Sequence, residues 1–96
     1  MAAGYVIGQM RITDPQAYER YRLQVMATVE AYGGEFLVRG GAQEVVEGTP
    51  PGTRSVILRF ASVEVAENWY NSPEYQKILP IRQGASTGAL TIVEGV

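Results

Sequence analysis

The chain has 96 residues, a net charge of −2 and an isoelectric point near 5.0. It has no basic run of the kind that binds nucleic acid, and no apolar stretch near the ~20 residues of a membrane span. The absence of Cys and His excludes disulfides, thiol chemistry, His-ligated metal or haem, and the commonest general base.

These exclusions predict a single domain over residues 1–96, with no cofactor, no metal, and neither nucleic acid nor membrane as a partner. Residues 1–6 lack the charged and apolar segments of a signal peptide. Together with the lack of Cys, this favours a cytoplasmic location. A chain of this length buries only roughly 60–68% of its surface on folding, so a second copy would help to stabilise a thin core.

The first third of the chain predicts a strand followed by a helix. Residues 4–12 carry apolar side chains on both faces and predict the strand. Asp14 can cap the helix and Pro15 suits its first position. The helix has an apolar stripe at three- to four-residue spacing, formed by Tyr18, Tyr21, Val25, Val29 and Tyr32. It is predicted to end at Gly33-Gly34, because glycine adopts the left-handed conformation without steric cost.

The middle of the chain predicts a hairpin. A second strand is expected over residues 35–41, continuing in weakened form through residues 45–46. The two consecutive glycines of this strand, Gly40 and Gly41, indicate a bulge or a close approach by another group. The Gly- and Pro-rich turn at residues 48–52 leads to a third strand over residues 54–60.

The last third predicts an interrupted helix and a final strand. Ser62 can cap a helix, and Ser72-Pro73 repeats the cap-then-proline signal, so a second short helix is expected to start there and to end at Pro80. A small-residue loop over residues 84–88 then precedes a strand over residues 89–94.

The resulting order, β-α-β-β-α-β, is the ferredoxin-like arrangement. The expected fold class is therefore α+β, with an antiparallel sheet and two helices on one face. A weak internal repeat supports two βαβ halves, because Val6-Ile7 corresponds to Val56-Ile57 and Asp14 corresponds to Glu64.

Alternation along the strands divides the sheet into two faces. The face expected to receive the helices comprises Val6, Gly8, Met10, Ile12, Phe36, Val38, Val56, Leu58, Phe60, Thr91 and Val93. The other face is mixed and comprises Tyr5, Ile7, Gln9, Arg11, Glu35, Leu37, Arg39, Ser55, Ile57, Arg59, Leu90, Ile92 and Glu94. Its large apolar side chains would each gain roughly 1–2 kcal/mol on burial. We therefore expect a homodimer through this mixed face, as a sandwich of two sheets or a closed barrel.

Several segments resemble one known family. They are YGGEFLVRGG at residues 32–41, Glu47-Gly48, AENWYNSPEY at residues 66–75, and Pro80-Ile81-Arg82. They resemble the domain of unknown function 1330 (DUF1330) family over essentially the whole chain. The resemblance implies the ferredoxin-like fold of the dimeric α/β-barrel superfamily, which also contains cofactor-independent oxygenases, haem-degrading enzymes, isomerases and dehydratases. The absence of His argues against a haem-binding or His-based mechanism in this chain.

Two arginines are candidate ligand-binding residues. Arg39 lies beside two glycines, and its guanidinium can hold a carboxylate or enolate through two hydrogen bonds. The alternative interpretation is an ion pair with Glu35, Glu94 or an acid of a partner chain. Arg82 follows the Pro80 break and is a candidate second anion-binding group, or a cation favoured by a helix C-terminus.

Trp69, Tyr75 and Ser72 are further candidates from the interrupted helix. Trp69 and Tyr75 could form an aromatic pocket wall, although packing of the second helix against the sheet explains Trp69 more simply. Ser72 is explained most simply as a helix cap, since the chain offers no His to activate it as a nucleophile. No catalytic residue and no metal ligand set is identified from the sequence.

Three functions remain open from the sequence. The first is a homodimeric binding protein, with a cavity for a small, partly apolar anion between the sheet and the second helix, Arg39 orienting the anion. The second is a cofactor-independent oxygenase or isomerase, in which Arg39 or Arg82 stabilises an enolate and Tyr75 transfers a proton. The third is a structural dimer without a ligand.

Overall fold

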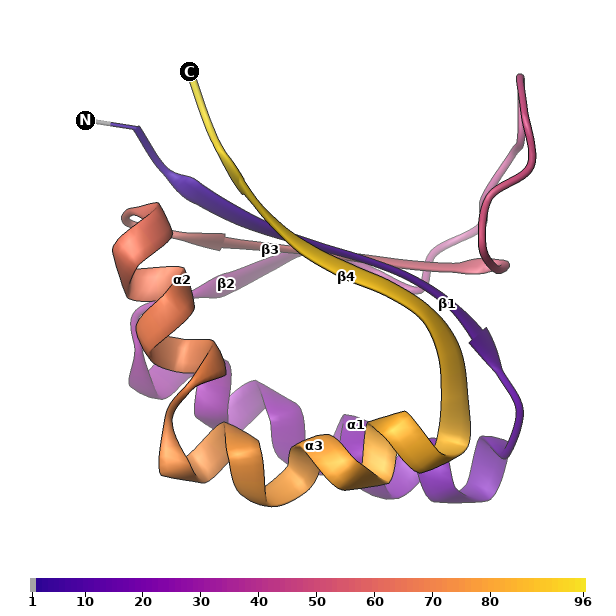
Figure 1. Ribbon diagram of the computed structural model, residues 1–96, viewed down its shortest axis with the longest axis horizontal. Coiled ribbons are helices and arrows are strands. Elements are labelled where there is room, and N and C mark those ends of the chain that lie inside the picture. Colours follow the sequence, from indigo (N-terminus) through magenta and orange to yellow (C-terminus); the bar gives the residue numbers. More distant parts are fainter. Residues whose placement is uncertain (1) are drawn as a thin grey trace.

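The computed structural model describes residues 2–96 as one four-stranded antiparallel sheet with helices on one face (Figure 1). The elements in chain order are β1 (Gly4–Ile12), α1 (Pro15–Ala31), β2 (Glu35–Arg39), β3 (Arg54–Phe60), α2 (Val63–Tyr70), α3 (Pro73–Ala85) and β4 (Ser86–Glu94). The strands lie in the order β2-β3-β1-β4. This confirms the expected α+β, ferredoxin-like arrangement, with the second helix divided into α2 and α3. None of the helices in residues 2–96 is long and apolar enough to span a membrane.

The predicted helix starts are confirmed by their hydrogen bonds. The Asp14 carboxylate accepts the backbone N–H of Ala17 at 3.1 Å. The Ser62 and Ser72 hydroxyls cap α2 and α3 in the same way, at 3.1 and 3.2 Å. These caps satisfy amide groups that have no partner within the helix. The serine at the α2–α3 break is therefore a structural residue.

The expected end of the last helix at Pro80 is wrong, because α3 continues to Ala85. Pro80 lies on the exposed side of α3, where water can reach the carbonyl that its missing N–H leaves without a helical partner. The neighbouring Ile78 and Leu79 are buried, so packing holds the helix through this point. The Ala85 carbonyl then accepts the amides of Thr13 and Asp14 at 2.8 and 3.1 Å. The expected loop over residues 84–88 is consequently absent, and β4 begins at residue 86.

The second strand is shorter than expected. It ends at Arg39, and the extension through residues 45–46 is wrong. Gly40 adopts a φ of 71°, which turns the chain out of the sheet, and its amide makes a last bond to the Ser55 carbonyl at 2.9 Å. Residues 40–53 form a long loop that rises on the side of the sheet opposite the helices (Figure 1).

The two sheet faces are confirmed for β1 and β3 but wrong for β4. Val6 pairs with Leu58 on one side and with Ile92 on the other, so all three share the face that the helices cover. Leu90 shares that face, and Thr91 and Val93 lie on the opposite one. Glu94, at the strand end, also has the parity of the helix face. The register with β1 fixes the orientation of β4. The apolar pattern of β4 alone is compatible with either orientation.

The face predicted for Arg39 is also wrong, and the cause is a β-bulge. Phe36 pairs with Leu58 on the helix face, as expected. The register then shifts between Phe36 and Val38, so Val38 pairs with Ile57 and Arg39 pairs with Val56. One extra residue on β2 therefore places Arg39 on the helix face and Val38 on the outer face.

Candidate functional site

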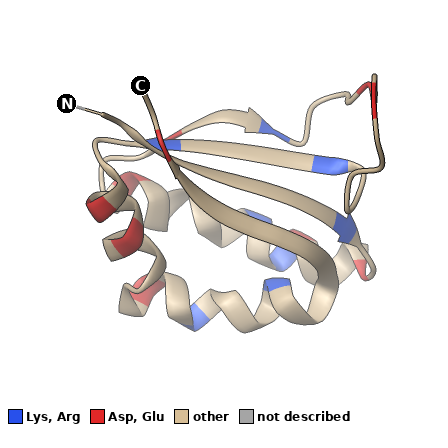
Figure 2. Ribbon diagram, turned by 45° about the horizontal axis from the view of Figure 1, so that its top comes forward, with Lys and Arg blue, Asp and Glu red and all other residues tan. Residues whose placement is uncertain are grey.

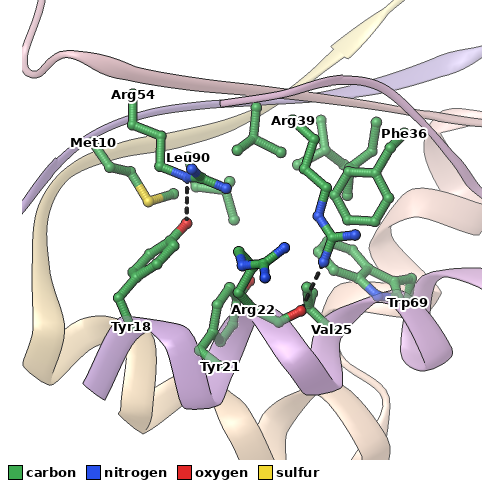
Figure 3. Close-up of a pocket in the computed structure, with 13 residues that line it drawn as sticks. Met10, Tyr18, Tyr21, Arg22, Val25, Phe36, Arg39, Arg54, Trp69 and Leu90 are labelled. Atoms are coloured by element: carbon green, nitrogen blue, oxygen red, sulfur yellow. Dashed lines mark hydrogen bonds between the residues drawn. The ribbon is translucent and has the colours of Figure 1, made fainter. Parts of the chain in front are cut away.

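A narrow cleft lies between α1 and the sheet, close to the edge strand β2 (Figure 3). Its walls are aliphatic and aromatic, formed by Val6, Met10, Val25, Val56, Leu58 and Leu90 together with Tyr18, Tyr21, Phe36 and Trp69. The cavity volume of the cleft is only about 20 Å³. The side chains therefore fill most of the cleft in this conformation.

Three arginines enter the cleft from three different elements: Arg22 from α1, Arg39 from β2 and Arg54 from β3 (Figure 3). Arg54 donates from Nε to the Tyr18 hydroxyl at 3.2 Å, and its guanidinium carbon lies 5.1 Å from the centre of the Tyr18 ring. Arg39 donates from Nη2 to the backbone carbonyl of Arg22 at 2.7 Å. Its guanidinium carbon lies 4.5 Å from the centre of the Phe36 ring. Arg39 and Arg54 thus both contact uncharged groups.

Arg39 lacks a compensating negative charge. Its Nε is buried and has no hydrogen-bond partner within residues 2–96. Burial, and then the positive charges of Arg22 and Arg54, lower the pKa of Arg39. The alternative ion pair between Arg39 and Glu35 does not form. Glu35 Oε1 instead lies 3.7 Å from Nη1 of Arg59. Among residues 2–96, Arg39 makes no salt bridge to any acid, Glu94 included.

Charge is distributed unevenly around this cleft. Figure 2 shows basic residues at the end of β2 and the start of β3, whereas acidic residues gather on α2. Glu19 is the acid that contacts these arginines in the described chain. Its Oε1 is hydrogen-bonded to Nη2 of the exposed Arg22 at 2.6 Å. That hydrogen bond lowers the pKa of Glu19, which therefore stays ionised at neutral pH. The cleft is a cationic site on an acidic protein.

Tyr75 and Arg82, two further predicted site residues, lie together outside the cleft lining. The hydroxyls of Tyr21 and Tyr75 are 2.8 Å apart, and Arg82 Nε donates to the Tyr75 hydroxyl at 3.2 Å. The Tyr75 side chain is fully buried, so it is closed to a ligand. Arg82 Nη1 lies 4.0 Å from the sulfur of Met10, a residue that does line the cleft. Tyr75 and Arg82 therefore contact the cleft residues Tyr21 and Met10 without lining the cleft themselves.

Trp69 is mainly a core residue, although one part of it lines the cleft. Its side chain is 1% exposed, and its ring centre lies 4.2 Å from that of Tyr75 and 5.4 Å from that of Phe60. The indole N–H donates to the Thr28 hydroxyl at 3.0 Å. The Ser72 hydroxyl donates to the Trp69 carbonyl at 2.7 Å as well as capping α3. Of the five predicted residues, only Arg39 and Trp69 therefore line the cleft.

The sequence interpretation did not include Tyr18, Arg22 and Arg54 as site residues. Arg54 has the same strand parity as Val56 and Leu58, so extending the apolar face by two residues would have placed it under the helices. Arg22 lies one turn after Tyr18 on the buried stripe of α1. Both signals were present in the sequence.

The buried tyrosine pair should make the fold sensitive to alkali. Burial raises the pKa of Tyr21 and of Tyr75 above the ordinary value of 10.0. Above pH 10 the unfolded chain therefore loses these protons while the folded chain keeps them. The free energy of unfolding should fall by up to about 1.4 kcal/mol per pH unit for each tyrosine. Urea denaturation between pH 9 and 11.5 should show a steeper decline for the wild type than for the Tyr21→Phe/Tyr75→Phe variant. Equal slopes would contradict this assignment.

The fold is shared with several solved structures of low sequence identity. A protein of unknown function from Rhodopseudomonas palustris, RPA0582, aligns with a TM-score of 0.81 at 17% identity, over 99% of this chain and 83% of its own. SnoaB, a cofactor-independent oxygenase from Streptomyces nogalater, aligns with a TM-score of 0.66 at 10% identity, over 97% of this chain and 92% of its own. A dimeric ferredoxin-like protein of unknown function from Thermobifida fusca aligns with a TM-score of 0.62 at 12% identity, over 99% of this chain and 92% of its own.

These similarities establish the fold and leave the function open. No curated protein matches the chain. The family model for the domain of unknown function DUF1330 matches residues 3–96, nearly the whole length. The chain therefore belongs to the DUF1330 family.

Proposed function

We propose that the protein binds a small, partly apolar anion in the cleft between α1 and the sheet. The observation that carries this proposal is the buried Nε of Arg39, which finds no hydrogen-bond partner in the described part of the chain and lies among positive charges. A buried donor without a partner costs free energy, and more so when it belongs to a charged group. An anionic head group would supply the missing acceptor. The site lies against α1, and not against the second helix as the sequence suggested.

The walls of the cleft indicate what else the ligand must carry. Beyond the arginines they are apolar, and they reach inward to Trp69 and Leu90. A ligand therefore needs a short hydrocarbon or aromatic body behind its head group. The cavity volume of about 20 Å³ is smaller than such a ligand, so the exposed Arg22 must swing outward as the ligand enters. Arg22 can do so readily, because its side chain is 39% exposed.

Calorimetric titration with hexyl sulfate tests this proposal, with hexanol as the uncharged control. We expect saturable binding of hexyl sulfate and weaker or undetectable binding of hexanol, since only the sulfate supplies an acceptor to Arg39. A protein that binds neither compound at millimolar concentration, or both equally, would overturn the proposal.

A cofactor-independent enzyme is the second candidate, favoured by the shared fold with the oxygenase SnoaB. In this candidate Arg39 and Arg54 would stabilise an enolate or phenolate formed in the cleft. Tyr75 is fully buried, so the proton-transfer role passes to Tyr18, whose hydroxyl accepts from Arg54. Oxygen-electrode measurements with a panel of aromatic hydroquinones test the oxygenase form. If the wild-type protein consumes oxygen no faster than an Arg39→Met variant, oxygenase activity on these compounds is excluded.

We further propose that a second copy of the chain covers the outer sheet face. No helix of the described chain covers this face (Figure 1), and it holds Tyr5, Ile7, Val38, Ile57 and Val93, with Leu37 next to Val38 in the bulge. Leu37 and Val93 are 50% and 44% exposed. Light scattering at micromolar concentration should give the mass of a dimer, and Ile7→Lys should give that of a monomer. A monomeric wild type would overturn this proposal, whereas a dimer that binds no anion would favour the structural interpretation.

A further inference from the structure

We propose that the head group bound in the cleft carries two negative charges, as a phosphate monoester or a geminal dicarboxylate does. This inference rests on the proposed function and adds the charge of the ligand to it. It comes from the number and direction of the guanidinium groups around the cleft, and from the single acid that contacts them.

The charges at the cleft can be counted from the contacts. Arg22, Arg39 and Arg54 contribute three positive charges, and none of the residues that line the cleft is an acid. Glu19 binds Arg22 through two hydrogen bonds at 2.6 and 2.9 Å, which compensates one charge. Three positive charges and one negative charge leave a net charge of +2, located on Arg39 and Arg54. A singly charged head group would leave one of these guanidinium groups uncompensated.

The backbone brings these two arginines together on the sheet. Arg39 pairs with Val56, and Arg54 lies two residues from Val56 on the same face of β3. The two are therefore diagonal neighbours, whose long side chains can reach a common ligand. Gly40 contributes by its lack of a side chain, because a Cβ there would collide with the Arg54 guanidinium. In Figure 3 the Arg39 and Arg54 guanidinium groups and that of Arg22 face the space between α1 and the sheet.

The hydrogen-bonding capacity of this arrangement also exceeds what a carboxylate can use. One guanidinium can bind both oxygens of a carboxylate. Arg39 and Arg54 approach from neighbouring strands, so a carboxylate would engage one of them and leave the other with its neutral partner. A phosphate or a geminal dicarboxylate has enough oxygen atoms for both. The narrow, apolar interior then admits only a short body behind the head group.

Ligand ionisation can be separated from protein ionisation at this site. The titratable and charged groups that line the cleft are Tyr18, Tyr21 and the three arginines. Glu19 contacts Arg22, and Tyr75 and Arg82 lie behind Tyr21. Tyrosine, arginine and a carboxylate paired with arginine do not ordinarily change charge between pH 5 and 8. An alkyl phosphate does, because its second pKa lies near 6. Any pH dependence of its binding in this range therefore reports the second negative charge of the ligand.

The test compares hexyl phosphate with hexyl sulfate, which have nearly the same shape but differ by one charge at pH 7.5. We expect hexyl phosphate to bind the wild-type protein about tenfold more tightly or better. We expect this preference to disappear at pH 5, where the phosphate is singly charged. Arg54→Met should reduce the preference to near one while hexyl sulfate still binds through Arg39. The same comparison of affinities between butylmalonate, a dianion, and hexanoate, a monoanion, tests whether the head group is a geminal dicarboxylate.

The outcomes separate this inference from the proposed function. Equal affinities for hexyl phosphate and hexyl sulfate at pH 7.5, with butylmalonate no tighter than hexanoate, would overturn the dianion inference and leave the cleft as a site for monoanions. A preference that persists in Arg54→Met would also overturn it, because the second charge would then be recognised elsewhere. Binding of none of the four anions would overturn the proposed function itself. A preference for either dianion that is lost in Arg54→Met supports the inference and identifies its source.

Discussion

Replacing Arg39 by methionine is expected to weaken the binding of hexyl sulfate by about ten- to a hundredfold. Arg39 is the cleft arginine whose buried Nε has no partner, so it is the group that gains most from an anion. Hydrogen bonds to charged groups are worth about 1.5–3 kcal/mol, which corresponds to the stated factor. Titration calorimetry of both proteins under the same salt conditions measures the change directly.

The stability of Arg39→Met should be close to that of the wild type. The substitution removes a cation–π contact with Phe36 and a bond to the Arg22 carbonyl, but it also removes an uncompensated, partly buried charge. Arg82→Met is the matched control, because Arg82 is also partly buried but does not line the cleft. Loss of binding in Arg82→Met together with unchanged binding in Arg39→Met would move the site to the tyrosine cluster and contradict our assignment.

Replacing Trp69 by alanine is expected to lower the free energy of unfolding by about 3–5 kcal/mol. The side chain is 1% exposed and packs between Phe60 and Tyr75, and its N–H bonds the Thr28 hydroxyl. A domain of this size has a total stability of about 5–15 kcal/mol, so the variant should lose a large share of it. Urea denaturation followed by circular dichroism measures the effect without relying on tryptophan fluorescence.

Two further variants separate the causes of this loss. Trp69→Phe keeps most of the ring packing but loses the bond to Thr28, and should cost about 1–2 kcal/mol. Leu23→Ala removes a side chain that is 71% exposed and should change stability by less than about 0.5 kcal/mol. If Trp69→Ala costs no more than Leu23→Ala, Trp69 is not a core residue, and its main role would be ligand contact.

Local signals in the sequence were sufficient for most of the fold. Asp14, Ser62 and Ser72 cap the helices through contacts that span three residues, so their positions could be predicted without tertiary information. The strands at residues 4–12 and 54–60 were predicted with their observed bounds. The continuation of α3 past Pro80 could not be predicted locally, because burial of Ile78 and Leu79 outweighs the cost of the proline.

The candidate site was less accessible to sequence reasoning because it depends on register. Arg39 was identified, but strict alternation placed it on the wrong face, since a bulge leaves no clear mark in the apolar pattern of β2. Tyr75 was assigned to a pocket wall, yet it is fully buried, and its hydroxyl is hydrogen-bonded to that of Tyr21, which lies 54 positions away in the chain. Long-range partners of this kind follow only from the assembled structure.

The bulge in β2 makes the charge of the cleft depend on the pairing register of the strand as well as on its residues. If the strand paired regularly after Phe36 without losing a residue, Arg39 would lie opposite Ser55, so the cleft would lose its guanidinium and the apolar outer face would gain a cation. Deleting Leu37 would instead leave Val38 opposite Ile57 and Arg39 opposite Val56, so a regular strand that is one residue shorter keeps the arginine in the cleft. When related sequences are aligned, an arginine three residues after this phenylalanine therefore belongs to the cleft only where the bulge is retained, whereas an arginine two residues after it belongs to the cleft in a regular strand.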